Sequence, residues 1–321
     1  MNNESRKDYK MSNIVIVLTT EKQGELASYY ASSRVERNAP GVIFAAKLGD
    51  TSITSYKSGK VMFQGNGAER ESSRWGKPND PTTKKTSSKG DKLPSNFEQL
   101  SVMGSDETGT GDYFGPVTVA AVYVSADKIA LVRELGVKDS KMLTDDFMRQ
   151  IAPDLMRALP HSILTVRNDK YNTIQARGWS QGKIKAMMHN QALHNVLGKI
   201  APEKPAHILI DQFAERGIYY NHLKNEKIIV KENVLFATKA EQLHVSVAAA
   251  SILARYAFLK EMDRLGDLVG FDLQKGASNK VDEMAARILL SKGEATLKSM
   301  TKWHFANTQK AHAIAAKKRS K

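Results

Sequence analysis

The sequence predicts an α/β protein in which a small α+β domain precedes a larger domain with a mixed sheet flanked by helices. Three observations support this prediction. The chain has 321 residues, which is enough for two domains of about 100–200 residues each. Its apolar content of 41% is sufficient for a hydrophobic core. The stretch 76–92 (GKPNDPTTKKTSSKGDK) lacks large apolar side chains and separates two regions that carry strand and helix patterns.

Residues 1–75 are expected to form the small domain, with a helix packed on an antiparallel sheet. Thr19 and Thr20 are available to cap the first helix, and glycine-containing turns separate the later strands. The expected elements are a strand at 13–18, a helix at 21–35, strands at 41–46, 52–56 and 60–64, and a short helix at 67–75.

Residues 76–98 are expected to be a flexible basic linker, and residues 99–321 the larger domain. In this domain consecutive strands are followed by alternating helices and strands, a pattern that predicts a mixed sheet. The expected strands are 100–105, 114–124, 162–168, 206–211 and 227–230. The expected helices are 126–135, 144–158, 180–200, 240–264, 281–291 and 301–316.

The net charge of +14 favours a polyanionic partner. The chain has no cysteine, which excludes disulfides, thiolate metal sites and a cysteine nucleophile and fits a cytoplasmic location. A short apolar run at 14–18 follows basic residues, but it is too short for a secretory signal, and no window is long enough to span a membrane. A monomer is the expected state.

Three acids occupy unusual places in the predicted large domain. Asp106 and Glu107 follow a short apolar strand and precede a glycine turn at 109–111. Asp211 ends the apolar strand AHILI. Acids at the ends of buried strands are costly unless they are paired or bind metal, and hard divalent cations prefer carboxylate oxygens. The pattern therefore predicts a divalent-metal site.

Glu241 is a fourth candidate, at the start of a predicted alanine-rich helix. It could equally serve as an acid that stabilises the positive end of the helix dipole. Four converging carboxylates would repel one another unless cations neutralise them, and bound metals also promote phosphoryl displacement. Together with the basic chain, the acids predict metal-dependent nucleic-acid hydrolysis.

Several segments resemble a type 2 ribonuclease H, and more closely its ribonuclease HIII subtype. They are DETGTGDYFGPV (106–117), KDSK (138–141), KAEQLHVSVAAASILAR (239–255), KGASNKVDE (275–283) and KWHFANTQKA (302–311). The sequence DYFGP distinguishes this subtype from ribonuclease HII. The N-terminal segment TSITSYKSGKVMFQG (51–65) resembles the TATA-binding-protein-like domain of the same subtype.

The resemblance implies an endonuclease that cleaves the RNA strand of RNA–DNA hybrids with Mg²⁺ or Mn²⁺ and leaves 5′-phosphates. Asp106, Glu107 and Asp211 match the catalytic acids that bind metal. Glu241 stands at the fourth catalytic position, where ribonuclease HII usually has Asp. Glu215, four residues after Asp211, is the rival for that role.

The expected substrate contacts fall into four groups. The turn residues bring backbone up to the RNA strand, where the 2′-hydroxyl distinguishes RNA from DNA. The other groups are basic or polar side chains, each of which could instead be part of a solvated surface. The expected contacts are Gly109, Thr110 and Gly111; Lys138 and Ser140; Lys183; and Lys57 and Lys60 in the first domain.

Two other functions remain open at this point. One is ribonuclease HII-like cleavage at single ribonucleotides in duplex DNA. The other is non-catalytic binding of nucleic acid through the same basic surface. The acids argue against a pure binding protein, since carboxylates beside phosphates weaken binding.

Overall fold

The computed structural model describes residues 13–37, 39, 41–76, 90–137 and 143–319. Contacts within the chain divide it into two compact units, Met1–Ser87 and Ser88–Lys321. Each unit has its own hydrophobic core.

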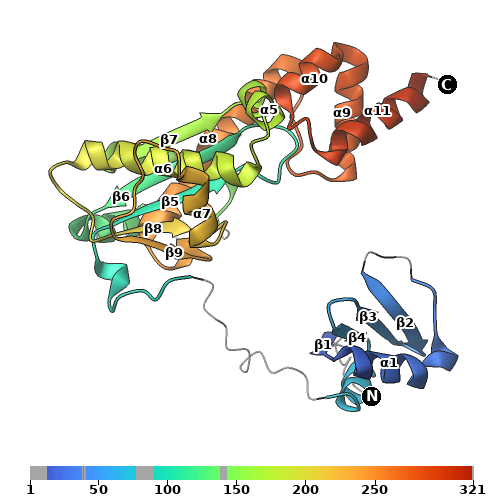
Figure 1. Ribbon diagram of the computed structural model, residues 1–321. Coiled ribbons are helices and arrows are strands. Elements are labelled where there is room, and N and C mark those ends of the chain that lie inside the picture. Colours follow the sequence, from blue (N-terminus) through green and yellow to red (C-terminus); the bar gives the residue numbers. More distant parts are fainter. Residues whose placement is uncertain (1–12, 38, 40, 77–89, 138–142, 320–321) are drawn as a thin grey trace, which may run out of the picture. The chain divides into compact units, whose positions relative to one another are not determined.

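The first unit is a four-stranded antiparallel sheet with helices on one face, which confirms the predicted α+β arrangement (Figure 1). The strand order is β1-β4-β3-β2. Its elements are β1 (Asn13–Val17), α1 (Thr20–Tyr29), a 3₁₀ turn (Ala31–Ser33), β2 (Val42–Leu48), β3 (Thr51–Tyr56), β4 (Lys60–Gln64) and α2 (Ala68–Ser73). Thr19 caps α1 by accepting a hydrogen bond from the Lys22 amide.

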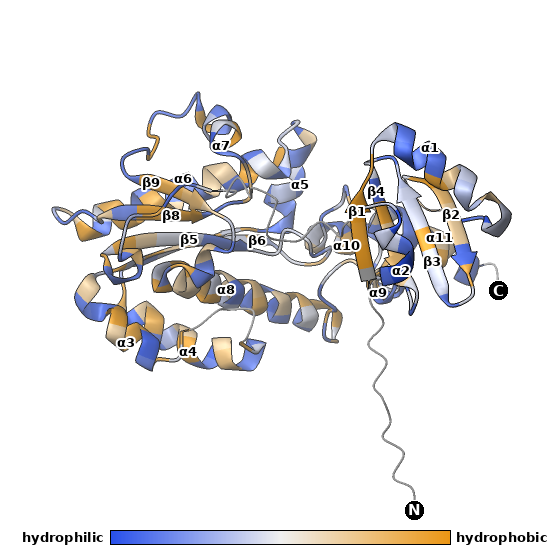
Figure 2. Ribbon diagram, turned by 90° about the horizontal axis from the view of Figure 1, so that it is seen from below, coloured by the Kyte–Doolittle hydropathy of each residue, from blue (hydrophilic) through white to orange (hydrophobic). Residues whose placement is uncertain are grey.

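Alternate residues of this sheet face the helices, and the others form an open face. Ile16, Ile53 and Phe63 are buried in the core. β1 is hydrophobic along its length (Figure 2), yet Val15 and Val17 are exposed. Side chains alternate across a strand, so these valines lie on the face that the helices leave uncovered.

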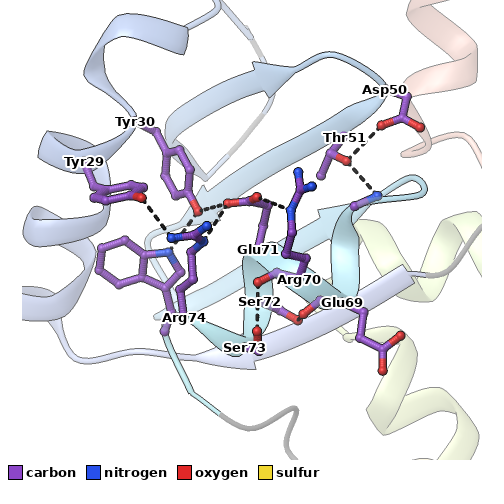
Figure 3. Close-up of polar contacts among 12 residues, drawn as sticks. Tyr29, Tyr30, Asp50, Thr51, Glu69, Arg70, Glu71, Ser72, Ser73 and Arg74 are labelled. Carbon is purple, nitrogen blue, oxygen red and sulfur yellow. Dashed lines mark hydrogen bonds and ion pairs between the residues drawn. The ribbon is translucent and has the colours of Figure 1, made fainter.

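A buried carboxylate, Glu71, ties the helices of the first unit together (Figure 3). It accepts hydrogen bonds from the Tyr30 hydroxyl at 2.8 Å and from Arg70 at 3.0 Å. Arg74 pairs at 3.4 Å with Oε2, the oxygen that also accepts from Tyr30, and Trp75 donates to the Tyr30 hydroxyl. Burial raises the pKa of Glu71, but the Tyr30 and Arg70 hydrogen bonds outweigh burial and leave the pKa below its ordinary value.

The second unit is built on a five-stranded mixed sheet, which confirms the predicted type of sheet, and its strand order is β7-β6-β5-β8-β9 (Figure 1). β5 pairs antiparallel with β6 and parallel with β8. The strands are β5 (Val102–Thr108), β6 (Val117–Val124), β7 (His161–Val166), β8 (His207–Asp211) and β9 (Val234–Ala237).

Helices cover both faces of this sheet, so β6 is buried along its whole length. One core packs the sheet against α6 and α7, and another packs it against α3, α4 and α8. The helices are α3 (Ile129–Glu134), α4 (Asp145–Ala158), α5 (Asn168–Ala176), α6 (Gln181–Ile200), α7 (Arg216–Leu223), α8 (Val245–Val269), α9 (Asn279–Lys292), α10 (Glu294–Met300) and α11 (Ala306–Arg319), with 3₁₀ turns at Phe97–Gln99, Ala126–Lys128 and Ala240–Gln242.

The predicted strand at 227–230 is wrong, because the edge strand is β9. The Asn190 side chain on α6 takes the backbone hydrogen bonds of this apolar run. Its amide nitrogen donates to the Ile228 carbonyl, and its oxygen accepts from the Val230 amide. The chain then turns at Asn233, which has a positive φ of 54°, and only after it does Val234 pair with Ile208.

The described end of the predicted linker, residues 90–98, is part of the second unit. Gly90 forms a β-bridge with Ala237. Asp91 accepts from the Phe236 amide at 2.7 Å, and Phe97 is buried. The flexible linker was therefore predicted to extend too far toward the C-terminus. The rest of it, residues 77–89, lies outside the described residues.

Candidate active site

Asp106 and Glu107 lie within β5, which continues to Thr108 instead of ending at 105 as predicted. Both remain paired with β6, where Asp106 is the pairing partner of Ala120 and Glu107 that of Val119. Neighbouring residues in a strand point to opposite faces. The two acids are accordingly held by different helices, Glu107 by α6 and Asp106 by α8.

Glu107 is held by two side chains of α6. The Lys185 ammonium lies 2.7 Å from Oε1, and His189 Nε2 lies 2.9 Å from Oε2. His189 is buried, and its Nδ1 lies 2.8 Å from the Ser105 hydroxyl. Burial raises the pKa of Glu107, but the His189 hydrogen bond and the Lys185 charge outweigh burial and leave the pKa below its ordinary value.

Asp106 faces α8, which approaches β5 closely at Gly104. A Cβ at Gly104 would lie 2.4 Å from the Val247 amide nitrogen, so a larger residue would push the helix away. This contact brings Ser251 of α8 to the Asp106 carboxylate. Burial and the charges of Glu107 and Asp211 nonetheless raise the pKa of Asp106 to about 8.

Asp211 ends β8, the parallel neighbour of β5. Ser105 pairs with Ile210, and the next step along both strands brings Asp106 and Asp211 side by side on the α8 face. Asp211 Oδ1 accepts a hydrogen bond from the Ala240 amide at 2.9 Å. Burial raises the pKa of Asp211 against this hydrogen bond, and the charges of Glu107 and Glu241 raise it further.

Glu241 is buried in the 3₁₀ turn Ala240–Gln242, before α8 begins. The expectation that it stands in the first turn of the helix is wrong. His244 caps α8 instead, and Lys239 precedes the turn with a positive φ of 57°. Glu241 also lines a hollow with Arg133 and His244. Glu215 is exposed at the N-cap of α7.

The glycine turn at 109–111 and the segment that follows it are fixed by close packing and by two side chains. Gly109 has a positive φ of 93°, and a Cβ there would lie 2.2 Å from the Pro116 carbonyl oxygen. The Gln181 side chain donates to the Thr110 carbonyl at 2.9 Å. The buried Lys302 ammonium donates to the carbonyls of Asp112 and Gly115 at 2.7 Å each. Gly111 is exposed, and a Cβ added there would have no heavy atom within 4 Å.

The remaining predicted contact residues lie on α6, in the first unit or outside the described residues. The Lys183 ammonium lies 4.2 Å from the centre of the Trp179 ring. Lys57 and Lys60 are exposed at the turn between β3 and β4 in the first unit. Lys138 and Ser140 lie outside the described residues.

The donor set suits a divalent cation. Carboxylate oxygens are hard ligands, and positive charge would relieve the repulsion that raises the pKa of Asp106. Over the parts of the chain that the structure describes, no three His, Asp or Glu side chains are gathered tightly enough to enclose a metal ion. Each acid is instead held separately, Glu107 by α6 and Asp211 by the Ala240 amide.

Sequence reasoning missed the two side chains that hold Glu107. The sequence patterns did not single out Lys185 or His189 as partners of an acid. The signal was their spacing, since residues four apart lie on one face of a helix. A Lys and a His on the face of a helix that packs against a sheet are typical of side chains that pair with an acid on that sheet.

The fold and the acids define a class, the type 2 ribonucleases H. Residues 103–308 match the family model described as Ribonuclease HII, and residues 13–88 match a domain of unknown function (DUF3378). The ribonuclease H2 structure from Pyrococcus horikoshii covers 69% of this chain and all of that chain at 22% identity, with a TM-score of 0.56, which shows the shared fold.

Relatives with higher sequence identity belong to one subtype of this class, the ribonucleases HIII. Ribonuclease HIII of Lysinibacillus sphaericus is 67% identical over 95% of this chain and 100% of that protein. Ribonuclease HIII of Bacillus subtilis is 49% identical over 97% of this chain and 100% of that protein. The structure of Bst-RNase HIII in complex with Mn²⁺ has a TM-score of 0.68 at 44% identity and covers 95% of this chain and 100% of that one.

The chain belongs to the ribonuclease HIII family, and it is a ribonuclease H with endonuclease activity. The resemblance stated from the sequence motifs is thereby confirmed. Among the helices that the structure describes, none combines the length and apolar character needed to cross a membrane.

Proposed function

We propose that the chain hydrolyses the RNA strand of RNA–DNA hybrids at Asp106, Glu107 and Asp211. The observation that supports this most is the mutual electrostatic coupling of the three acids at adjoining strands. Repelling carboxylates on a protein of net charge +14 fit a site that receives cations together with a phosphate backbone.

Asp106, Glu107 and Asp211 would hold Mg²⁺ or Mn²⁺. The relative crystallised with Mn²⁺ supports this choice, as does the oxygen-only donor set of the three acids. Such ions, when bound, supply positive charge that stabilises the transferring phosphoryl group and activates the attacking water. The chain's own contribution is to fix the acids on β5 and β8, where the register sets their spacing.

The glycine turn would carry the RNA strand. Gly109, Thr110 and Gly111 present backbone next to the acids, and Gln181 anchors the turn through the Thr110 carbonyl. The exposed Gly111 leaves room for a ribose-phosphate to approach. Lys183 on α6 would contribute positive charge toward the backbone of the duplex, and Lys138 and Ser140 complete the proposed set.

Glu241 is the proposed fourth catalytic acid, because its charge acts on Asp211. The alternative for Glu241 is a structural role in the hollow that it lines with Arg133 and His244. Glu215 is the rival for the role of fourth catalytic acid. Single-turnover cleavage by Glu241→Gln and Glu215→Gln distinguishes them. Loss of cleavage in Glu241→Gln with retention in Glu215→Gln supports the assignment, and the reverse pattern transfers the role to Glu215.

The first unit would bind substrate without taking part in chemistry. Its open sheet face and the exposed Lys57 and Lys60 offer a basic surface beside a sheet. A second binding unit on the same chain raises the effective concentration of the substrate at the acids. The proposed division is residues 1–75 for binding and residues 99–321 for catalysis, with residues 90–98 belonging to the second unit. The proposed enzyme is monomeric and cytoplasmic.

Cleavage assays test the proposed function. A uniform RNA–DNA hybrid and a DNA duplex with one ribonucleotide are each incubated with Mg²⁺ and with Mn²⁺. The proposal predicts cleavage of the uniform hybrid with either ion and none without metal. Cleavage confined to the single-ribonucleotide duplex would establish the ribonuclease HII-like alternative, and binding without cleavage of either substrate would contradict a nuclease.

A further inference from the structure

The two oxygens of Glu107 are held in different ways. Oε2 contacts His189, which is buried and linked in turn to Ser105. A neutral imidazole with its proton on Nε2 satisfies both contacts, because Nε2–H donates to Glu107 and Nδ1 accepts from the Ser105 hydroxyl. Breaking this chain would leave buried polar groups unpaired, which costs about 1–3 kcal/mol each. This side of Glu107 is therefore fixed.

Oε1 is held by Lys185, which is the more easily exchanged partner. The Lys185 side chain is 12% exposed, and a lysine reaches its partner through a flexible four-carbon stem. Its ammonium also lies 4.2 Å from the centre of the Phe213 ring. When Lys185 leaves Glu107, the ammonium can keep this cation–π contact and gain water, but it loses its 2.7 Å ion pair with Oε1.

A metal ion that binds Oε1 of Glu107 meets the Lys185 charge that already lies there. Either the ammonium moves away or two positive charges share one carboxylate. Both routes oppose metal binding, since charges a few ångströms apart in a partly buried site interact by a few kcal/mol. Asp106 and Asp211 carry no comparable cation in their described contacts.

We propose that Lys185 is an internal cation that balances Glu107 in the metal-free enzyme and competes with the divalent metal for it. Lys185 is a positioning residue that acts through Glu107 and does not touch the reacting atoms. This inference rests on the proposed metal-binding role of Glu107. It predicts that the wild-type enzyme binds metal more weakly than its carboxylates alone would allow.

The test is Mn²⁺ binding to the full-length, metal-free protein, followed through the electron paramagnetic resonance signal of free Mn²⁺ at one fixed pH. Lys185→Met is expected to tighten Mn²⁺ binding about three- to tenfold, because one opposing charge is removed beside a ligand. Lys185→Arg keeps the charge and should not tighten it. Lys199→Met is the matched control, since it removes the same charge near the other end of α6, where Lys199 donates to the His161 carbonyl, and it should leave Mn²⁺ affinity unchanged.

The outcomes separate this inference from the proposed function. Unchanged or weaker Mn²⁺ binding by Lys185→Met overturns the competition, as does equal tightening in Lys185→Arg or in the Lys199→Met control. Glu107→Gln reports on the site itself. If Glu107→Gln loses Mn²⁺ binding while Lys185→Met matches wild type, only the competition fails. If Glu107→Gln binds Mn²⁺ like wild type, the proposed metal site fails as well.

Discussion

Two acids that are largely removed from solvent, the buried Glu71 in the first unit and the partly buried Asp106 in the second, differ in what surrounds them. Glu71 has a tyrosine hydroxyl and two arginines around it, and its pKa lies below the ordinary value (Figure 3). Asp106 has two other carboxylates nearby, and its pKa is raised to about 8. Burial is common to both, so burial alone does not mark a functional acid. A shortage of compensating positive charge around the acid is what marks it as functional.

The largest expected effect follows from removing an acid of the coupled set. Asp211→Asn should lower cleavage of a uniform hybrid about 10³-fold or more, since a metal ligand and its charge are lost. Asn keeps the oxygen that accepts from the Ala240 amide, so the fold and hybrid binding should persist. Single-turnover cleavage and a binding titration measure both. Retained turnover would show that Asp211 is not part of the active site.

Deleting residues 1–87, the first compact unit, should weaken hybrid binding about 10- to 100-fold and leave cleavage at saturating enzyme nearly unchanged. The unit would supply binding surface, whereas the coupled acids all belong to the second unit. Affinity is measured in a metal-free titration and cleavage under single-turnover conditions. Unchanged affinity of the truncated protein would refute the binding role of the first unit.

Replacing the two buried acids should change stability in opposite directions. Asp106→Asn should stabilise the metal-free protein by about 1–3 kcal/mol, because the carboxylate with a raised pKa is destabilising in the folded state when charged. Glu71→Gln should destabilise the first unit by about 1–2 kcal/mol, since a buried acceptor loses its charge between exposed arginines.

Hydrogen exchange of peptides from β1–β4 and from β5–β6 resolves the two units separately. Glu69→Gln is the matched control, because Glu69 is exposed near Glu71 on α2 and should have little effect. Destabilisation by both Asp106→Asn and Glu71→Gln would erase the contrast between the two acids.

The smallest expected effect concerns Asp145, a partly exposed acid with two cationic partners. Burial raises its pKa, but Arg255 and Lys275 outweigh burial and lower the pKa to about 2. The folded pKa lies below the unfolded value of about 3.9, so the stabilisation is complete above that pH and is lost as the pH falls toward 2. Asp145→Asn should therefore cost about 1–2 kcal/mol at neutral pH and nothing at the acid end.

Acid unfolding of Asp145→Asn, of wild type and of the exposed neighbour Asp146→Asn measures this difference. The stability curves of wild type and Asp145→Asn should converge as the pH approaches 2, and Asp146→Asn should follow wild type. A gap that stays constant with pH would mean that packing, not charge, is lost.

The sequence predicted the fold class because β6 and β8 contain apolar runs and alternate along the chain with segments of helical pattern. It also predicted Asp106, Glu107 and Asp211 as candidates, since acids at the ends of buried strands stand out. It did not predict that Asp106 and Glu107 face different helices, because this depends on how far the β5–β6 pairing extends.

Other features depended on side-chain contacts that pattern does not reveal. The run at 227–230 looked like a strand, but the Asn190 side chain takes its backbone hydrogen bonds. Glu241 was expected in the first turn of a helix. It lies instead in a 3₁₀ turn, and α8 begins only after its N-cap residue His244. The first error came from a contact between α6 and a segment far from it in sequence. The second came from a local cap that makes the helix begin later than its apolar pattern predicts.

The most direct test of the central claim is calorimetric titration of Mn²⁺ into metal-free wild type, Asp106→Asn and Glu71→Gln. Removing the acid that lacks compensating charge should abolish or greatly weaken Mn²⁺ binding, whereas removing the compensated acid should leave it as in wild type. Mn²⁺ binding by Asp106→Asn with wild-type affinity would contradict the claim that the repelling acids of β5 and β8 are the metal site.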